Sequence, residues 1–281
     1  MMTSAVITLP APAKLNLFLH ITGRRADGYH ELQSVMQYVE LADELSFRVL
    51  DEASIYLKTA YSEVPVEDNL VYRAATLLQQ YTGIRQGASI TLQKNIPVGA
   101  GMGGGSSDAA TTLLGLNYLW QTQLDINTLA QLGQSLGADI PFFIRGKAAW
   151  VEGIGERLTP INLPQPWYLL IIPPCAVPTH DLYSDPQLTR DCQPIRIQDY
   201  RMGDGLNVFT APVCRRYPEV ARALDWLNQY QPARMTGSGS VLFARFDTAA
   251  EAGRIAALAP DELRCVVTRG VNTSPVWVLT Q

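Results

Sequence analysis

One glycine-rich stretch has the residue types and spacing needed to bind phosphate. It runs from Ile96 to Trp120 and reads "IPVGAGMGGGSSDAATTLLGLNYLW", with five glycines between positions 99 and 105, two serines, and then an apolar segment of helical period. A helix start leaves its first four N–H groups unpaired and carries the equivalent of about half a positive charge. Glycines before it let the backbone approach an anion closely. The stretch therefore predicts a phosphate-binding loop at a helix start.

Two better-known phosphate-binding patterns fit this stretch only in part. Gly99, Gly101 and Gly104 satisfy G-x-G-x-x-G, but the "QTQLDIN" that follows the predicted helix is too polar for the second strand of a dinucleotide-binding unit. A Walker-type loop fits Gly99 and Gly104, but Gly105 stands where its lysine should be. The lysine must come from elsewhere in the chain, or none is used. A flexible turn before a capped helix is the alternative interpretation.

Two residues outside the loop have the chemistry that phosphoryl transfer to an alcohol requires. Lys14 and Asn16 share one face of an alternating strand, opposite three leucines, and Asp139 lies in the turn "GADIPFF" before Pro141. Such a transfer needs a cation near the moving charge and usually a carboxylate that accepts the hydroxyl proton. Taken alone, Lys14 fits a solvated edge lysine and Asp139 a turn or capping aspartate. Together with the loop, they form the groups of a kinase site.

The elements that must position these groups follow from the apolar periodicity. We expect a strand over 13–20, a second strand that ends at Pro97, and a helix capped by Ser106 or Ser107. A further helix over 126–136 leads into Asp139. Beyond a proline-rich boundary at 160–166 we expect strands over 167–172, 241–246 and 275–280, and helices near 207–230 and 248–258. The boundary predicts an N-terminal lobe over 1–160 and a C-terminal lobe over 161–281.

The composition excludes several classes of function. The 281 residues are 47% hydrophobic, and the formal net charge of -4 gives no electrostatic footprint for a nucleic-acid backbone. The four cysteines are widely spaced without a C-x-x-C pair, which is typical of reduced thiols, and no apolar run has the length of a membrane span. We expect a cytoplasmic protein with a small-molecule substrate and neither nucleic-acid nor membrane partners. The oligomeric state stays open.

Five motifs follow one another in the order "PAKLNLFL", "DGYHEL", "PVGAGMGGGSSDAA", "LGADIPFF" and "TGSGSVLFARF". Together they resemble the GHMP kinase superfamily, and the resemblance extends from Pro12 to "RGVNTSP" near the C-terminus. The resemblance implies a two-lobed α+β fold with the active site in the cleft between the lobes. It also implies that Asp139 is the base and that Lys14 orients or polarises the acceptor hydroxyl. The ATP loop would consist of Pro97, Val98, Gly99, Ala100, Gly101, Met102, Gly103, Gly104, Gly105, Ser106 and Ser107.

The narrower motifs "PAKLN", "DGYH" and "GADIPFF" resemble the branch of this superfamily that phosphorylates a cytidine diphosphate alcohol. That resemblance implies that Tyr29 stacks on the cytosine, that His30 makes polar contacts with it, and that Tyr183 forms a second aromatic wall. Asn16 would also contact the substrate. Without the resemblance, Tyr29 is an ordinary loop tyrosine and His30 an ordinary surface histidine.

The resemblance also directs Asn69 and Lys94 toward the adenine, and it implies Mg²⁺ bound with the nucleotide. A helix N-cap for Asn69 and a strand-end surface lysine for Lys94 are the alternatives. Met102 stands where the superfamily commonly has leucine, a near-isosteric change that we expect to be neutral. Another small-molecule kinase, such as homoserine or mevalonate kinase, or a non-catalytic nucleotide sensor remains possible. A sensor would need neither Lys14 nor Asp139.

Overall fold

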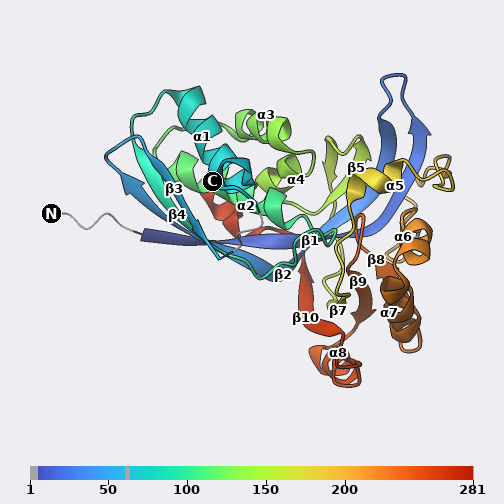
Figure 1. Cartoon of the computed structure of the whole chain (residues 1–281). Coiled ribbons are helices and arrows are strands. Elements are labelled where there is room, and N and C mark those ends of the chain that lie inside the picture. The colour runs from blue at the N-terminus through green and yellow to red at the C-terminus, as the bar shows by residue number, and fades with distance from the viewer. Residues whose placement is uncertain (1–5, 61–63, 281) are drawn as a thin grey trace.

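A long antiparallel hairpin forms the spine of the molecule. The computed structural model describes residues 6–60 and 64–280, and in it β1 (Val6–Arg24) pairs with β2 (His30–Leu50) along nearly their whole length. Figure 1 shows α1 to α4 gathered on one side of this hairpin and β7 to β9 with α6 to α8 on the other. The hairpin therefore lies between two groups of elements, and the mixture of helices and largely antiparallel strands confirms the predicted α+β class.

Nine elements follow the hairpin among the described residues of the N-terminal part. The helix α3 is amphipathic and capped by Asp125, whose carboxylate accepts from Asn127 N and Thr128 N. In contrast, α2 is buried around nearly its whole circumference from Ser107 to Leu116, because it packs between β1, α1 and α4. The elements are β3 (Ile55–Thr59), η1 (Val66–Asp68), α1 (Leu70–Thr82), β4 (Gly87–Gln93), α2 (Gly104–Leu119), α3 (Ile126–Leu136), α4 (Ile140–Arg145), β5 (Ala149–Gly153) and β6 (Arg157–Pro160).

The C-terminal part begins with β7 and ends back in the N-terminal lobe. Its last strand, β10, pairs with β7 and then with β2 through Gly270 and Val271. The main sheet has the strand order β3-β4-β2-β10-β7-β9-β8, and β1 and β5 also pair with β2. The elements are β7 (Trp167–Ile172), α5 (Thr179–Tyr183), α6 (Thr210–Arg216), α7 (Pro218–Asn228), β8 (Ala233–Met235), β9 (Leu242–Phe246), α8 (Ala249–Ala256), β10 (Arg264–Val271) and η2 (Pro275–Thr280).

The hydrophobic core is divided among three clusters of buried side chains. One lies under α1 to α4 and includes Val276 of η2. A second lies among α6, α7 and the C-terminal strands, yet includes Leu19 and Ile21 of β1. The third lies along β1 between them. Both ends of the chain thus contribute to the core of the opposite lobe, and the division at 160/161 stays a prediction.

Two local expectations are wrong, the N-cap of α2 and the strand over 275–280, and one predicted strand is confirmed but distorted. The helix α2 begins at Gly104, so Ser106 and Ser107 lie inside its first turn, and the Ser107 hydroxyl donates to Pro12 O at 2.7 Å instead of capping. The strand over 13–20 buries both of its faces, and a register shift after Asn16 places Phe18 in the same cluster as the preceding leucines. Residues 275–280 form a 3-10 helix rather than a strand.

The other predicted elements are confirmed, in particular the strand before the glycine loop, α3, β7, β9 and the helices near 207–230 and 248–258. Among residues 6–60 and 64–280, no helix combines the length and apolar character needed to cross a bilayer.

Candidate active site

A cavity of about 670 Å³ opens beside the glycine loop and is lined by both lobes. Its walls come from β1, the loop before α2, the turn before α4, α5 and a second glycine turn at 237–238. Nearly all of the predicted site residues line it. The exceptions are Ser107, Tyr29 and His30, which lie outside the set of described residues that line this cavity.

The glycine loop turns directly into α2. Gly103 occupies the N-cap position with φ 72°, a left-handed conformation that costs other residues about 1–2 kcal/mol. A Cβ atom built on Gly103 would lie 2.9 Å from Phe143 Cζ and 3.2 Å from Lys14 Cε. This position therefore requires glycine on both conformational and steric grounds. The first N–H groups of α2 have no intrahelical partner, and Gly104, Gly105 and Ser106 line the cavity. Binding of phosphate at this helix start stays a prediction.

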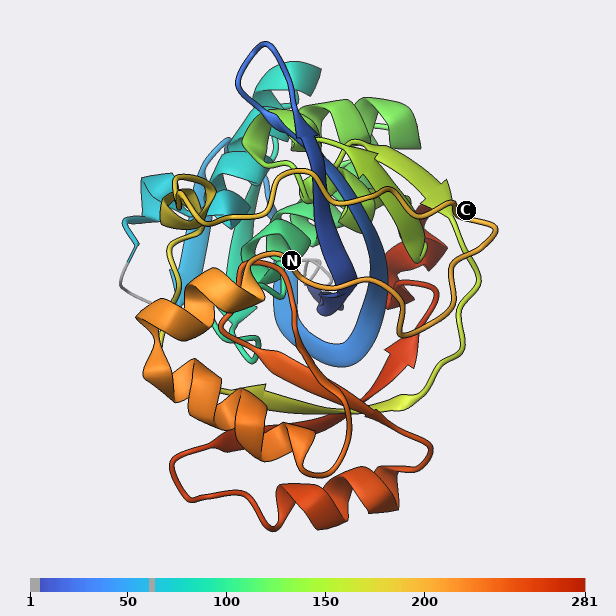
Figure 2. The same cartoon turned by 90° about the vertical axis from the view of Figure 1, so that its right-hand side faces the viewer.

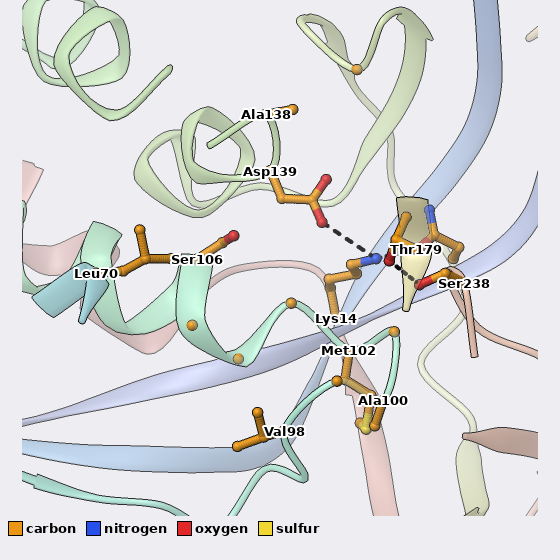
Figure 3. Close-up of a pocket in the computed structure, with 18 of the residues that line it drawn as sticks. Lys14, Leu70, Val98, Ala100, Met102, Ser106, Ala138, Asp139, Thr179 and Ser238 are labelled. Carbon is orange, nitrogen blue, oxygen red and sulfur yellow. Dashed lines mark hydrogen bonds and ion pairs between the residues drawn. The ribbon is translucent and has the colours of Figure 1, made fainter. Parts of the chain in front are cut away.

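Lys14 and Asp139 meet across the cavity. The distance from Lys14 Nζ to Asp139 Oδ2 is 3.5 Å, and Figure 3 shows the two side chains pointing toward one another. The Lys14 ammonium also donates to Asn16 Oδ1, and Asn16 Nδ2 donates to Ser34 Oγ at 2.8 Å. The Lys14 backbone N–H donates to Met102 O at 3.0 Å, which joins β1 to the glycine loop. Lys14 is only 3% exposed, so it is not a solvated edge residue.

Asp139 stands at the N-terminus of α4 without capping it. Its backbone has φ -82° and ψ -15°, helical values rather than the extended ones typical of a cap, and its side chain makes no capping hydrogen bond. The carboxylate is one-third exposed and remains available to the cavity. The capping interpretation of Asp139 is therefore wrong.

Lys94 forms a buried ion network rather than a surface contact. Its ammonium contacts Asp43 Oδ2 and lies 2.8 Å from Asp108 Oδ2. Burial lowers the pKa of Lys94, but the two carboxylates outweigh it and leave this pKa raised. Burial raises the pKa of Asp108 to about 7. The charge of Lys94 lowers this pKa, whereas the nearby carboxylate of Asp43 raises it further, because the two carboxylates share one ammonium. A Cβ on Gly104 would lie 3.2 Å from Lys94 Nζ, so the network sits directly beneath the loop.

Asp43 and Asp108 were not identified from the sequence. Asp108 follows the two serines of the loop motif, so its position in the first turns of α2 was a usable signal. Asp43 gives no such signal, since it lies 51 residues from Lys94 and reaches it only through the pairing of β2 with β4. Its other carboxylate oxygen accepts from Ile96 N at 2.8 Å, just before the glycine loop.

Asn69 lines the cavity and also caps α1. Its side-chain oxygen accepts from Val71 N at 3.0 Å, so the capping interpretation is confirmed, and its contact with adenine stays a prediction.

The predicted substrate end of the cavity is built around Tyr183. Its ring stacks on His30, with 5.2 Å between centroids and 24° between planes, and packs edge-on against Phe209. Burial, with a smaller effect of the Asp139 charge, raises the pKa of Tyr183 to about 12, so its hydroxyl stays neutral. Tyr29 is 61% exposed at the hairpin tip. Its stacking on a base stays a prediction.

The second glycine turn contacts the first backbone to backbone. A Cβ on Gly101 would lie 2.2 Å from Thr236 O, and one on Gly237 would lie 2.5 Å from Gly101 O. Thr236 Oγ1 accepts from Asn16 N at 2.9 Å, and Thr179 and Ser238 hydrogen-bond through their hydroxyls at 2.7 Å (Figure 3). Four segments far apart in the sequence thus converge on one cavity.

Such a site can bind a polyphosphate at a helix start and act on a hydroxyl held between an ammonium and a carboxylate. Two domain models match the chain: the GHMP kinases N terminal domain over residues 69–147 and the GHMP kinases C terminal domain over residues 195–262. The chain belongs to the GHMP kinase family. It is a small-molecule kinase with ATP as its phosphoryl donor, in the two-lobed α+β fold that the sequence motifs implied.

Two known proteins place the chain within this family, and a third shares its fold. It is 53% identical over 265 residues to the 4-diphosphocytidyl-2-C-methyl-D-erythritol kinase of Nitrosococcus oceani, covering 94% of this chain and 95% of that one. A crystal structure of 4-(cytidine 5'-diphospho)-2C-methyl-D-erythritol kinase is 33% identical, with a TM-score of 0.83 over 94% of this chain and 99% of that one. Homoserine kinase from Cytophaga hutchinsonii has a TM-score of 0.68 over 98% and 97% of the chains, but at 17% identity it shares the fold alone.

Proposed function

We propose that the chain transfers the γ-phosphoryl group of ATP to the 2-hydroxyl of 4-diphosphocytidyl-2-C-methyl-D-erythritol, giving the 2-phosphate and ADP. This step belongs to the non-mevalonate route to isoprenoid precursors. The observation that carries the chemistry is the 3.5 Å approach of Lys14 Nζ to Asp139 Oδ2 beside the start of α2. The substrate is supported by two relatives, 53% and 33% identical over most of both chains, that are kinases of this alcohol.

In the proposed reaction, the acceptor hydroxyl lies beside this pair, within hydrogen-bonding distance of both side chains. Asp139 accepts the hydroxyl proton, and Lys14 orients the oxygen and stabilises the charge that develops on it. The N–H groups at the start of α2 hold the phosphates, and Asn16 fixes the Lys14 ammonium through its side-chain oxygen. Most of the catalytic effect would come from this positioning and electrostatic stabilisation.

Mg²⁺ usually binds nucleotides through their phosphates, several waters and one or two side-chain oxygens. The Ser106 hydroxyl lines the cavity at the start of α2, and no residue in the described part of the chain hydrogen-bonds to it. Ser106 would therefore hold a Mg²⁺ ion that enters with ATP, and the ion would neutralise charge on the phosphates. We also place the activity in the cytoplasm, which the four free cysteines at described positions support.

The test is release of ADP in the presence of ATP and a single candidate alcohol. We expect turnover with 4-diphosphocytidyl-2-C-methyl-D-erythritol and none with the unsubstituted methylerythritol phosphate, homoserine or mevalonate. Preferred turnover of homoserine or mevalonate would assign the chain to another branch of the family. ATP binding without ADP release from any of these alcohols would identify a nucleotide sensor and would contradict the proposal.

A further inference from the structure

The chain between α5 and α6 has no recognisable motif, yet it packs along the hairpin at the substrate end of the cavity. Cys192 N donates to Ile21 O at 2.9 Å, and Ile195 exchanges two hydrogen bonds with the side chain of Gln33, at 2.8 and 3.0 Å. Figure 2 shows this segment crossing over the hairpin. It is therefore held against the strands that carry the predicted cytosine site.

The side chain of Arg190 donates four hydrogen bonds in this segment. Its two terminal nitrogens donate to the carbonyls of Leu188, Tyr183 and Asp185 at 3.0, 2.9 and 2.8 Å. Its remaining nitrogen, Nε, donates to His30 Nε2 at 3.3 Å. The three carbonyl contacts fix the guanidinium plane, so the direction of the fourth bond is fixed as well.

This bond decides where His30 carries its proton. A guanidinium can only donate, so the imidazole nitrogen facing it must be the unprotonated one, and the proton of the neutral ring lies on Nδ1. Desolvation, then the charges of Arg190 and Arg24, lower the pKa of His30. The other groups near the ring are the neutral Tyr183 and the adjacent Glu31, which is paired with two other arginines. Both geometry and charge favour the neutral Nδ1–H form.

We propose that Arg190 is a positioning residue that holds His30 as the Nδ1–H tautomer, so that this N–H donates to the acceptor edge of the substrate's pyrimidine. The inference rests on the proposed function for its ligand. Among residues 6–60 and 64–280 the imidazole forms no other hydrogen bond, so Nδ1 is available. The ring lies against Tyr183, which lines the cavity.

A fixed donor would also discriminate between pyrimidines. Cytosine presents the acceptors N3 and O2 on this edge, whereas uracil carries a proton on N3 that would face the Nδ1–H. A donor left without its acceptor costs enough to lower affinity about tenfold or more. Arg190 would thereby contribute to cytidine specificity without contacting the substrate.

The tautomer is measured on the free protein by two-dimensional NMR of the imidazole nitrogens. The chain has only three histidines, so assignment through a His30→Gln variant is practical. We expect His30 protonated on Nδ1 at neutral pH, with a pKa below 6.5. In Arg190→Met both tautomers should be populated and the pKa should rise, whereas Arg190→Lys should retain more of the pKa depression but lose the fixed tautomer. A wild-type ring protonated on Nε2, or an Arg190→Met ring unchanged in both respects, would overturn the proposal.

Steady-state kinetics test the consequence for the substrate. Arg190→Met should raise KM for the cytidylyl substrate about tenfold and leave kcat and the KM for ATP nearly unchanged. Arg196→Met is the matched control, because Arg196 is an exposed arginine of the same segment whose side chain pairs with Asp199 alone among the described residues. An unchanged substrate KM in Arg190→Met would refute the specificity role. Absence of wild-type turnover would instead refute the proposed function, and the NMR result would still decide the tautomer.

Discussion

At the scale of single residues, Asp139 shows which part of a residue's role can be predicted from the sequence. The turn before Pro141 suggested a carboxylate that could act as a base, but equally a helix cap. The structure distinguishes the two, because Asp139 has helical backbone angles instead of the extended angles of a cap and makes no hydrogen bond to the first N–H groups of α4. The approach of Lys14 across the cavity then supplies the cation.

We predict that Asp139→Asn lowers the single-turnover rate of phosphoryl transfer by roughly 10²- to 10⁴-fold, the usual contribution of a general base. Affinities for ATP and for the alcohol should change little, since the amide keeps the size of the side chain. The control is Asp261→Asn, an exposed aspartate in a turn far along the sequence. A near-wild-type rate for Asp139→Asn would show that the proton leaves by another route.

A second prediction at the scale of residues concerns the stabilising effect of the Lys94 ammonium. Replacing it with methionine leaves Asp43 and Asp108 buried without their cation, which should lower the free energy of unfolding by about 3–5 kcal/mol. Chemical denaturation measures the change, with Lys58→Met, an exposed lysine on β3, as the control. Equal stability of the two variants would mean that the network is not paired as described. Because Gly104 rests on Lys94, ATP affinity should fall as well.

At the scale of elements, periodicity predicted most helices and strands, but not the points where they are distorted. The loop motif and the helix after it were recognised, whereas the helix start at Gly104 depends on the left-handed Gly103 and its contact with Phe143. The same limit applies to β1, where a shift in pairing with β2 changes which side chains share a face. Such features depend on partners distant in sequence, which composition and spacing do not encode.

The glycine loop gives the element-scale prediction. Gly103→Ala should destabilise the protein by about 1–2 kcal/mol and weaken ATP binding by about tenfold, because the new Cβ must displace the loop from Phe143. Gly253→Ala in α8 is the matched control: it has no neighbour within 4 Å and should be neutral or slightly stabilising. Calorimetric titration with ATP measures the affinity of each variant for the nucleotide. Unaltered ATP binding by Gly103→Ala would show that the loop does not belong to the nucleotide site.

At the scale of the whole molecule, both lobes depend on shared elements. Leu19 and Ile21 of the hairpin lie in the C-terminal core, and β10 and Val276 return to the N-terminal lobe. We therefore predict a single cooperative transition in scanning calorimetry, and no stable fold for a fragment comprising 1–160 alone. Two resolved transitions, or a folded fragment, would show that the lobes are independent domains.

The shared hairpin also limits how this enzyme can exchange parts with its relatives. In a chimera joined near residue 160, a foreign C-terminal half would pack against Leu19 and Ile21 of this hairpin. That half would have lost the side chains of its own hairpin, which complete its core. Recombination within the family should therefore succeed only when the hairpin is inherited together with the C-terminal half whose core it completes. The glycine loop, which contacts the turn at Gly237, would have to be inherited with them.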